Sequence, residues 1–324
     1  MKFPLVSVIV PMYNVERYIA STIKCVLDQT WKYIELIIVD DGSTDSSFSI
    51  AKEFKDQRIK IIQQQNQGAA IARNTGIKHA SGDFFQFLDG DDLLSENKIE
   101  NQVELLLKHP AYVSVSSTIH FNDNDSIAEQ APSKYEQYFL KSSDDPADFL
   151  THLWGGYTPY GSMIAVHSWL TPKSIIVKTG FWNEALTLDD DGEYFARVIL
   201  NSKGIIYSDQ GFSYYRKQTG NTLSRINSEA KIKSMLDAAL IKKKILTEKT
   251  NMFPAQLALY KLLMDVAIKS FPQYPSVYKI ALKELPLISP KKYQPSIGGP
   301  KIQKIALLFG WKTARIIQYI LKQK

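Results

Sequence analysis

The first third of the chain alternates short apolar runs with segments of helical periodicity, and this alternation restricts the possible folds more than any other feature. The apolar runs predict strands over residues 5–10, 34–39, 58–63, 83–88 and 112–119. The spacing of apolar residues between them predicts helices over residues 15–29, 46–54, 68–79 and 95–108. Strands that alternate with helices form βαβ units, so we expect an α/β fold with a largely parallel sheet.

The rest of the chain has a different composition. Residues 121–148 are polar and rich in turn formers, which predicts a surface excursion. Residues 152–174 combine glycine and proline with many aromatic residues, a composition suited to a shaped binding surface. Residues 227–269 have a strongly helical pattern. We therefore expect a helical region after the α/β part.

Composition narrows the compartment and the class of protein. The single cysteine, Cys25, excludes an internal disulfide framework and a cysteine-rich zinc site, and it suits a reducing compartment such as the cytoplasm. We interpret Cys25 as a small packing residue beside a helical stripe, not as a nucleophile. The apolar start of the chain is interrupted by Pro11 and Asn14, so it predicts a strand and not a signal peptide. No apolar run is long enough to span a bilayer.

The net charge of +6 is concentrated at one end. Residues 285–324 contain eight Lys or Arg and no Asp or Glu, so residues 1–284 carry a net charge of −2. A mildly acidic body argues against a nucleic-acid-binding protein.

Carboxylates occur in three groups, Asp40-Asp41, residues 89–92 (Asp-Gly-Asp-Asp) and residues 189–191 (Asp-Asp-Asp). The first two follow predicted strands directly, and ligands of open α/β sheets bind at the carboxyl ends of strands. Carboxylates gathered in one crevice repel one another unless a cation offsets their charge. Oxygen ligands without His or Cys spacing favour Mg²⁺ or Mn²⁺. An Asp-x-Asp turn can equally be a solvated surface loop.

Four segments together resemble family 2 of the inverting glycosyltransferases, which have the GT-A fold. They are VIVPMYN (8–14), VDDGSTD (39–45), GAAIARNTG (68–76) and LDGDD (88–92), in that order and spacing. The resemblance is tight over residues 5–94, looser through Arg197, and gives little beyond Arg225. It implies a Rossmann-like mixed sheet flanked by helices, followed by a helical C-terminal region.

The resemblance also implies that three regions of the chain have different roles. Residues 1–115 would form the half that binds a nucleotide sugar, and residues 116–225 the half that binds the acceptor and carries the catalytic base. Residues 226–324 would form a helical region that ends in a basic amphipathic tail.

On this resemblance, the donor nucleotide has its own set of residues. Asp41 would accept a hydrogen bond from a uracil-like base, and Tyr13 would lie against that base. Arg73 would contact the diphosphate side of the donor, a task suited to a guanidinium fork. The remaining members of the implied donor site are Pro11, Asn14, Asp89 and Gly90.

The metal would bind at residues 89–92. Asp91 is implied as the main ligand, Asp92 lies nearby, and Asp89 would touch the ribose or the metal. A divalent cation, Mn²⁺ or Mg²⁺, would neutralise charge on the leaving nucleoside diphosphate. Which of Asp89 and Asp92 shares the ion with Asp91 stays open.

An inverting transfer also needs a base that takes the proton of the attacking hydroxyl. The family pattern has an acidic pair followed six residues later by arginine, and counting back from Arg197 gives Asp191. Asp190 remains a rival, since this chain has three consecutive aspartates. Acids also favour helix N-termini, which is the alternative interpretation of the run. His167, Trp169 and Arg197 are candidates for the acceptor site, although tryptophans such as Trp169 are more often core residues.

The chain lacks the Gln-x-x-Arg-Trp motif and the membrane spans of processive synthases of this family. The sequence therefore predicts an enzyme that moves one hexosyl or N-acetylhexosaminyl unit, or a few, from a nucleoside-diphosphate sugar. UDP is the favoured nucleotide, and the acceptor is a hydroxyl of a glycan or lipid-linked glycan in surface polysaccharide assembly.

Two other classes of protein fit the sequence less well. A sugar nucleotidyltransferase would carry a glycine-rich loop with Arg and Lys soon after the first strand, and residues 11–17 offer none. A non-catalytic membrane adaptor would tolerate loss of the acidic groups, and all three are present.

The basic tail suggests a second partner. On one helix, Lys301, Lys304, Lys312, Arg315 and Lys322 fall on one side, which predicts a contact of residues 301–324 with an anionic membrane surface. The enzyme would then be cytoplasmic and peripheral on the inner face of the cell membrane. The alternative is a helix that docks on the body of the protein, and Gly310 weakens the prediction of a single helix.

Overall fold

A computed structural model describes residues 3–217, 228–288 and 293–322. The chain divides into two compact units. The first comprises Met1–Phe149, Met163–Glu184 and Asp190–Thr222, and the second comprises Leu150–Ser162, Ala185–Asp189 and Leu223–Lys324. The boundary that the sequence predicts at residue 225 lies outside the described residues. Among the helices that the structure describes, none combines the length and apolarity that crossing a bilayer requires.

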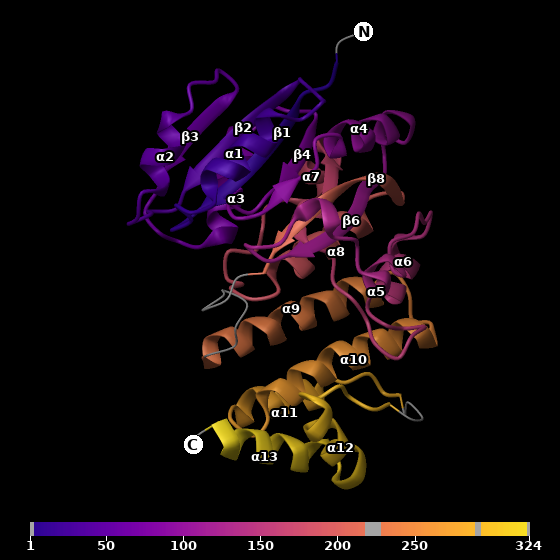
Figure 1. The fold of residues 1–324 in the computed structure, drawn as a ribbon. Coiled ribbons are helices and arrows are strands. Elements are labelled where there is room, and N and C mark those ends of the chain that lie inside the picture. The colour runs from indigo at the N-terminus through magenta and orange to yellow at the C-terminus, as the bar shows by residue number, and fades with distance from the viewer. Residues whose placement is uncertain (1–2, 218–227, 289–292, 323–324) are drawn as a thin grey trace. The chain divides into compact units, whose positions relative to one another are not determined.

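An eight-stranded sheet is the framework of the first unit in the part of the chain described (Figure 1). Its strands, in spatial order, are β3 (Ile59–Gln63), β2 (Ile34–Asp40), β1 (Val6–Met12), β4 (Phe84–Phe87), β7 (Trp169–Pro172), β6 (Val113–Phe121), β8 (Ile205–Arg216) and β5 (Leu93–Leu94). The first four run parallel, whereas β7 is antiparallel to both of its neighbours and β5 is antiparallel to β8. The predicted mixed sheet is confirmed.

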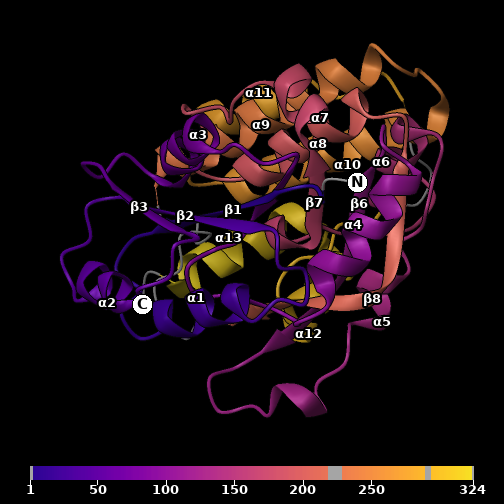
Figure 2. The same cartoon turned by 90° about the horizontal axis from the view of Figure 1, so that it is seen from above.

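Helices cover both faces of this sheet. Figure 2 shows α1 (Ile19–Leu27) and α2 (Ser47–Glu53) on one side of strands β1 to β3, and α3 (Ala69–His79) on the other. The remaining helices that begin in the first unit are α4 (Lys98–Lys108), the short α5 (Lys134–Gln137), α6 (Pro146–Leu153), α7 (Lys173–Thr179) and α8 (Asp190–Asn201), with 3₁₀ turns at Ile127–Glu129 and Val166–Ser168. The chain passes from the first unit to the second within α6.

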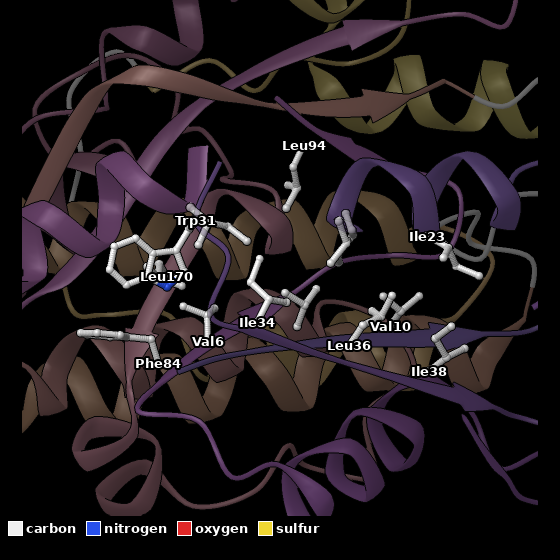
Figure 3. Packing of buried hydrophobic residues seen from close by; sticks show 14 of the residues in the cluster. Val6, Val10, Ile23, Trp31, Ile34, Leu36, Ile38, Phe84, Leu94 and Leu170 are labelled. Atoms are coloured by element: carbon white, nitrogen blue, oxygen red, sulfur yellow. The ribbon is translucent and has the colours of Figure 1, made fainter. Parts of the chain in front are cut away.

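The alternation of side chains along β1 supplies both layers of the core. Val6 and Val10 belong to one buried cluster with Ile23 of α1 and with Ile34 and Leu36 of β2, and Figure 3 shows Val6 beside Ile34 at one end of it and Val10 toward Ile23 at the other. On the opposite face, a Cβ added to Gly76 of α3 would lie 2.3 Å from the Cγ2 atom of Ile9. The apolar runs are therefore continuous because the strands are buried on both faces.

The structure differs from the sequence predictions at two places in this unit. Helix α1 begins at Ile19 instead of residue 15, because Asn14 takes a positive φ of 51° and the chain turns before the helix starts. The predicted excursion over residues 121–148 is not wholly exposed, since Phe139 and Leu140 are buried. The sequence gives no sign of this, because Phe139 and Leu140 lie within a segment that is otherwise mainly polar.

The described part of the second unit is mainly helical. Its helices are α9 (Glu229–Thr247), α10 (Phe253–Ser270), α11 (Pro275–Lys283), α12 (Pro300–Phe309) and α13 (Trp311–Lys322). Helices α9, α10 and α11 share one apolar cluster, and Ala314 of α13 packs with Met264 and Ile268 of α10 in another. The predicted single helix over residues 301–324 is wrong, because Gly310 adopts a φ of 82° and separates α12 from α13. Residues 323–324 lie outside the described residues.

Candidate active site

The loop after β4, residues 89–92, is called the acidic loop below. Its Gly90 packs closely, since an added Cβ would lie 3.1 Å from the Cγ2 of Val15 and 3.2 Å from the carbonyl oxygen of Pro11. The loop turns sharply, with the Asp92 N–H donating to the Asp89 carbonyl at 3.1 Å. Strand β4 thus delivers three carboxylates at the carboxyl end of the parallel part of the sheet, as the sequence predicts.

Arg73 of α3 joins the acidic loop to helix α8. Its Nη2 donates to Asp89 Oδ1 at 2.8 Å and its Nη1 to Asp190 Oδ2 at 3.1 Å. The guanidinium lies 4.5 Å above the ring of Trp182, and the side chain is 7% exposed. Burial disfavours its charge, but the carboxylates of Asp89, Asp190 and Asp191 outweigh burial and raise the pKa of Arg73. The cation is therefore permanent and already engaged by protein anions.

Asp92 is the buried member of the acidic loop. Its side chain is 3% exposed, Oδ1 accepts the Arg216 N–H at 2.7 Å, and Oδ2 lies 3.2 Å from His167 Nδ1. Burial, together with the charges of Asp91 and Asp89, raises the pKa of Asp92 well above its ordinary value. Burial also lowers the pKa of His167 to about 3, so the imidazole is neutral at pH 7 and its contact with Asp92 is not an ion pair.

The three consecutive aspartates have different surroundings. Asp189 has a positive φ of 62° and belongs to the second unit, where the buried Lys242 bonds both of its oxygens at 2.6 and 2.7 Å. Asp190 begins α8 and is held by Arg73. Asp191 occupies the next position of that helix and is partly buried. Its negative charge raises the pKa of both Arg73 and Tyr215. The acidic run is thus a helix N-terminus, and its members do not share one role.

Asp41 organises the loop that leads into α3. Its Oδ1 accepts from Gln64 Nε2 at 2.8 Å and from the Gln67 N–H at 2.9 Å, while Oδ2 accepts the Gly68 N–H at 2.8 Å. The residue is 3% exposed. A carboxylate offers about four acceptor sites, so further hydrogen bonding to a ligand remains possible.

The end of β1 and the turn that follows it carry three of the residues predicted for the donor site. Tyr13 is exposed, and Pro11, in β1, is partly buried. Asn14 Oδ1 accepts the Thr44 N–H at 2.8 Å, and the Asn14 N–H donates to Ser43 Oγ at 3.2 Å. Asn14 therefore ties the turn after β1 to the segment after β2.

Two of the three candidates for the acceptor site are buried. His167 and Trp169 are 0% and 2% exposed, and Trp169 stacks on Phe195. Arg197 is partly exposed, forms an ion pair with Glu193 at 2.6 Å and donates to the Thr179 carbonyl at 2.9 Å. All three side chains take part in the packing around α8 and β7, and their role as acceptor contacts stays a prediction.

Sequence reasoning missed Tyr215, which lies on β8 and is 36% exposed. Its ring stacks on His167 with centroids 6.0 Å apart. Burial, with the charges of Asp92, Asp89, Asp91 and Asp191, raises the pKa of Tyr215 to about 12. The charges of the acidic loop and of the predicted base thus both act on the Tyr215 hydroxyl. Its position in a β-prone run far beyond the tight resemblance gave no signal of this.

The carboxylates of the acidic loop suit a metal ion whose coordination is completed by a bound ligand. In the three described stretches of the chain, no three acidic, histidine or cysteine side chains are arranged to enclose a metal ion. Mg²⁺ and Mn²⁺ favour oxygen donors, and Mg²⁺ is usually held by one or two protein carboxylates plus substrate phosphates. Asp91 and Asp89 are partly exposed, and their charges act on the buried Asp92. This donor set fits a divalent cation shared with a diphosphate.

Comparison with known proteins decides the family. A model described as glycosyl transferase family 2 matches residues 7–163. An uncharacterized glycosyltransferase of Haemophilus influenzae is 44% identical over 220 residues, which cover 67% of this chain and 80% of that protein. The chain belongs to glycosyl transferase family 2. The predicted family 2 glycosyltransferase is confirmed.

Other family 2 relatives differ in length. The glycosyltransferase GlyA of Streptococcus pneumoniae is 29% identical over 265 residues, 81% of this chain, but the match spans only 38% of GlyA. The protein WfgD of Escherichia coli, named as a UDP-Glc:alpha-D-GlcNAc-diphosphoundecaprenol beta-1,3-glucosyltransferase, is 41% identical over 132 residues, 40% of this chain and 52% of WfgD.

The fold also has solved counterparts. Residues 1–349 of Staphylococcus aureus TarS, crystallised with UDP-GlcNAc, superpose with a TM-score of 0.69 at 18% identity, covering 98% of this chain and 92% of that chain. The GT-A fold predicted for this family 2 chain is therefore confirmed.

Proposed function

We propose that this family 2 chain is a metal-dependent, inverting glycosyltransferase that uses a nucleoside-diphosphate sugar, with UDP the favoured nucleotide. The observation that carries the proposal is the convergence of Arg73, Asp89 and Asp190, which joins the acidic loop to the start of α8. A donor phosphate site and a base must lie close together in any single-displacement transfer.

The donor would be bound by the segments that follow the parallel strands. Tyr13 is exposed and can lie against a base, while Asp41 shapes the loop ahead of α3 and retains acceptor capacity. Arg73 is not free to swing to a phosphate without breaking two ion pairs. Its role in this proposal is to hold the donor loop and the base helix together, with its charge facing the diphosphate.

Asp91 is the proposed main metal ligand and Asp89 the proposed second one. Of the two candidates for sharing the ion, Asp89 is favoured, because its side chain is 32% exposed whereas that of Asp92 is 3% exposed. The bound cation would supply charge neutralisation for the leaving diphosphate.

Asp191 is the proposed base. Asp190 is bound by Arg73, and taking a proton would cost it that ion pair. Asp191 lies at the same helix end, and its charge, like those of the acidic loop, raises the pKa of Tyr215. A carboxylate there can accept the proton of an attacking hydroxyl while the sugar bond breaks on the opposite face.

The proposed acceptor is a hydroxyl of a glycan or lipid-linked glycan, in surface polysaccharide assembly. The name of the relative WfgD includes a diphosphoundecaprenol-linked acceptor, which supports this class. The tail of the chain supports a membrane location as well. Leu308 and Phe309 are each 68% exposed, Ile320 is 52% exposed, and Lys304 and Lys312 are exposed on the same two helices. Basic helices with exposed apolar side chains bind anionic lipid surfaces, which supports the proposal that the enzyme is peripheral on the cytoplasmic face of the membrane.

Arg315, one of the five basic residues predicted to lie on one side of the tail, does not belong to that surface. Arg315 Nε donates to the Phe271 carbonyl at 3.2 Å and Nη2 to the Lys269 carbonyl at 3.1 Å. It docks α13 on the helices of its own unit, so both interpretations of the tail apply to different faces of the same helices.

The proposed activity is tested by incubating the protein with UDP-, GDP- and TDP-sugars and measuring release of nucleoside diphosphate. We expect release from one UDP-sugar with Mn²⁺ or Mg²⁺ and none with EDTA. Equal release in EDTA would contradict the metal assignment, and no release from any donor would contradict the activity.

A further inference from the structure

Two side chains, Thr22 and Arg216, form hydrogen bonds with the main chain of the acidic loop. Neither residue belongs to the motifs of the resemblance or has a role in the proposed chemistry. All four main-chain carbonyls of the loop have partners. The Asp89 carbonyl accepts the Asp92 N–H within the loop. The carbonyls of Gly90 and Asp92 each lie 3.0 Å from Thr22 Oγ1, and the Asp91 carbonyl accepts from Arg216 Nε at 2.8 Å.

Thr22 is placed for this contact by α1. The helix buries Thr22 together with Ile19, Ile23 and Val26, and Thr22 is 0% exposed. The hydroxyl has one proton and three carbonyl oxygens within reach, and those of Gly90 and Asp92 are nearer than that of Tyr18, which lies 3.4 Å away. A buried carbonyl that loses a donor carries a desolvation penalty. The hydroxyl therefore resists any movement of the loop away from α1.

Arg216 is placed by β8, which pairs with the strand that follows the acidic loop. Tyr214 of β8 is paired with Leu93 of β5, two residues beyond Asp91. The N–H of Arg216 donates to Asp92 Oδ1 at 2.7 Å while its Nε reaches the Asp91 carbonyl. A single residue thus fixes one carboxylate and one carbonyl of the loop.

The guanidinium of Arg216 is itself immobilised. Its Cζ lies 4.6 Å from the ring centroid of Tyr18 and 4.5 Å from that of Phe121. Its Nη1 donates to Asp123 Oδ1 at 2.9 Å, and the Tyr18 hydroxyl donates to Asp123 Oδ2 at 3.0 Å. The Arg216 side chain is 9% exposed. A planar cation held between two rings and a carboxylate has one orientation, which is what an anchor requires.

We propose that Thr22 and Arg216 are positioning residues that fix the main chain of the acidic loop, so that Asp91 and Asp89 are preorganised for a divalent cation. The inference rests on the metal site of the proposed function. Residues that orient metal ligands from behind typically change metal affinity about 10- to 100-fold when they are replaced.

The test measures how strongly Mn²⁺ tightens the binding of UDP. The dissociation constant of UDP is determined by calorimetry in EDTA and in Mn²⁺, and the ratio of the two is compared among variants. Thr22→Val keeps the volume of the side chain and removes the hydroxyl, and Arg216→Lys keeps the charge and removes the Nε donor. Each is expected to reduce the ratio about tenfold. The affinity for uridine, which has no phosphate to share a metal, is expected to stay within about twofold, which shows that the variant is folded and that its nucleoside site is intact.

Two matched variants control for the loss of a buried hydroxyl and of an arginine. The Thr118 hydroxyl bonds Ser168 Oγ at 2.8 Å, and Arg58 Nη1 donates to the Leu27 carbonyl at 3.3 Å. Thr118→Val and Arg58→Lys should leave the ratio unchanged. If Thr22→Val and Arg216→Lys also leave it unchanged, the positioning proposal is wrong while the metal site stands. If the wild-type protein itself shows a ratio of one, the metal site is wrong and the positioning proposal falls with it.

Discussion

Arg73 Nη1 lies 3.1 Å from Asp190 Oδ2, although 117 residues separate the two in the chain. The same guanidinium reaches Asp89 at 2.8 Å. One buried cation therefore connects the loop that carries the proposed metal ligands to the helix that carries the proposed base. The sequence left Asp190 and Asp191 as rivals for the base, and this contact is the reason for proposing Asp191.

Asp191→Asn should lower the rate of sugar transfer by a factor of roughly 10² to 10⁴, the range expected for loss of a general base. Binding of UDP with Mn²⁺ should stay near the wild-type value, because the proposed metal ligands are unchanged. The rate of nucleoside-diphosphate release at saturating donor is the measurement. Asp190→Asn, the matched variant, should lose less activity and should also weaken stability, since it leaves Arg73 short of one anion. The reverse order of rates would move the base to Asp190.

Cys25 should be chemically quiet in the folded protein. Burial raises the pKa of its thiol to about 12, and the thiolate is the reactive form. We expect very slow alkylation by iodoacetamide at pH 8 and complete alkylation of one thiol per chain in urea, which mass spectrometry measures. Fast labelling of the folded chain would overturn the interpretation of Cys25 as a packing residue.

Gly76→Ala should destabilise the first unit by about 1–3 kcal/mol, because the new methyl group would overlap Ile9 in a closely packed layer. Urea denaturation followed by circular dichroism measures the loss. In an Ile9→Ala background the same substitution should cost little or become stabilising, since the space is then free. An equal cost in both backgrounds would show that the two residues are not coupled.

The tail should bind vesicles that contain phosphatidylglycerol and not vesicles of phosphatidylcholine alone. Each Lys near an anionic surface contributes about 1 kcal/mol, so Lys301→Glu/Lys304→Glu should weaken binding at least about tenfold in a sedimentation assay. Leu308→Ser/Phe309→Ser should also weaken binding to the vesicles that contain phosphatidylglycerol, although it leaves the charge of the tail unchanged. Lys55→Glu/Lys60→Glu makes the same charge change on exposed residues of the first unit and should have no effect. Equal binding by all three variants would exclude the tail as the contact.

Much of the fold was predictable because buried strands leave a direct trace in the sequence. The strand predicted over residues 34–39 appears as Ile34–Asp40, and that predicted over residues 58–63 as Ile59–Gln63. The first is mostly apolar because β2 is buried inside the sheet, whereas β3 lies at the edge of the sheet, is partly buried and combines apolar with polar residues. Gly310 carried a local signal too, and the helix does end there.

The site was less predictable because its contacts join residues that are distant in the chain. Thr22 has the spacing of a core residue, and only the position of the acidic loop beside α1 reveals its hydrogen bonds. Trp169 and His167 look like binding residues by type, but both are buried, against Phe195 and Tyr215 respectively, and no local pattern indicates this. Local patterns identify which side chains can do chemistry, whereas tertiary packing determines which of them are accessible.

The most direct test of the central claim is a calorimetric titration of UDP into the wild-type protein and Asp91→Asn, each in Mn²⁺ and in EDTA. The claim is that the acidic loop holds a divalent cation against the diphosphate of the donor. It predicts that Mn²⁺ tightens UDP binding at least about tenfold in the wild type and has no effect in Asp91→Asn, with the two proteins equal in EDTA. Identical UDP affinity of the wild type in Mn²⁺ and EDTA, or an undiminished effect of Mn²⁺ in Asp91→Asn, would contradict it.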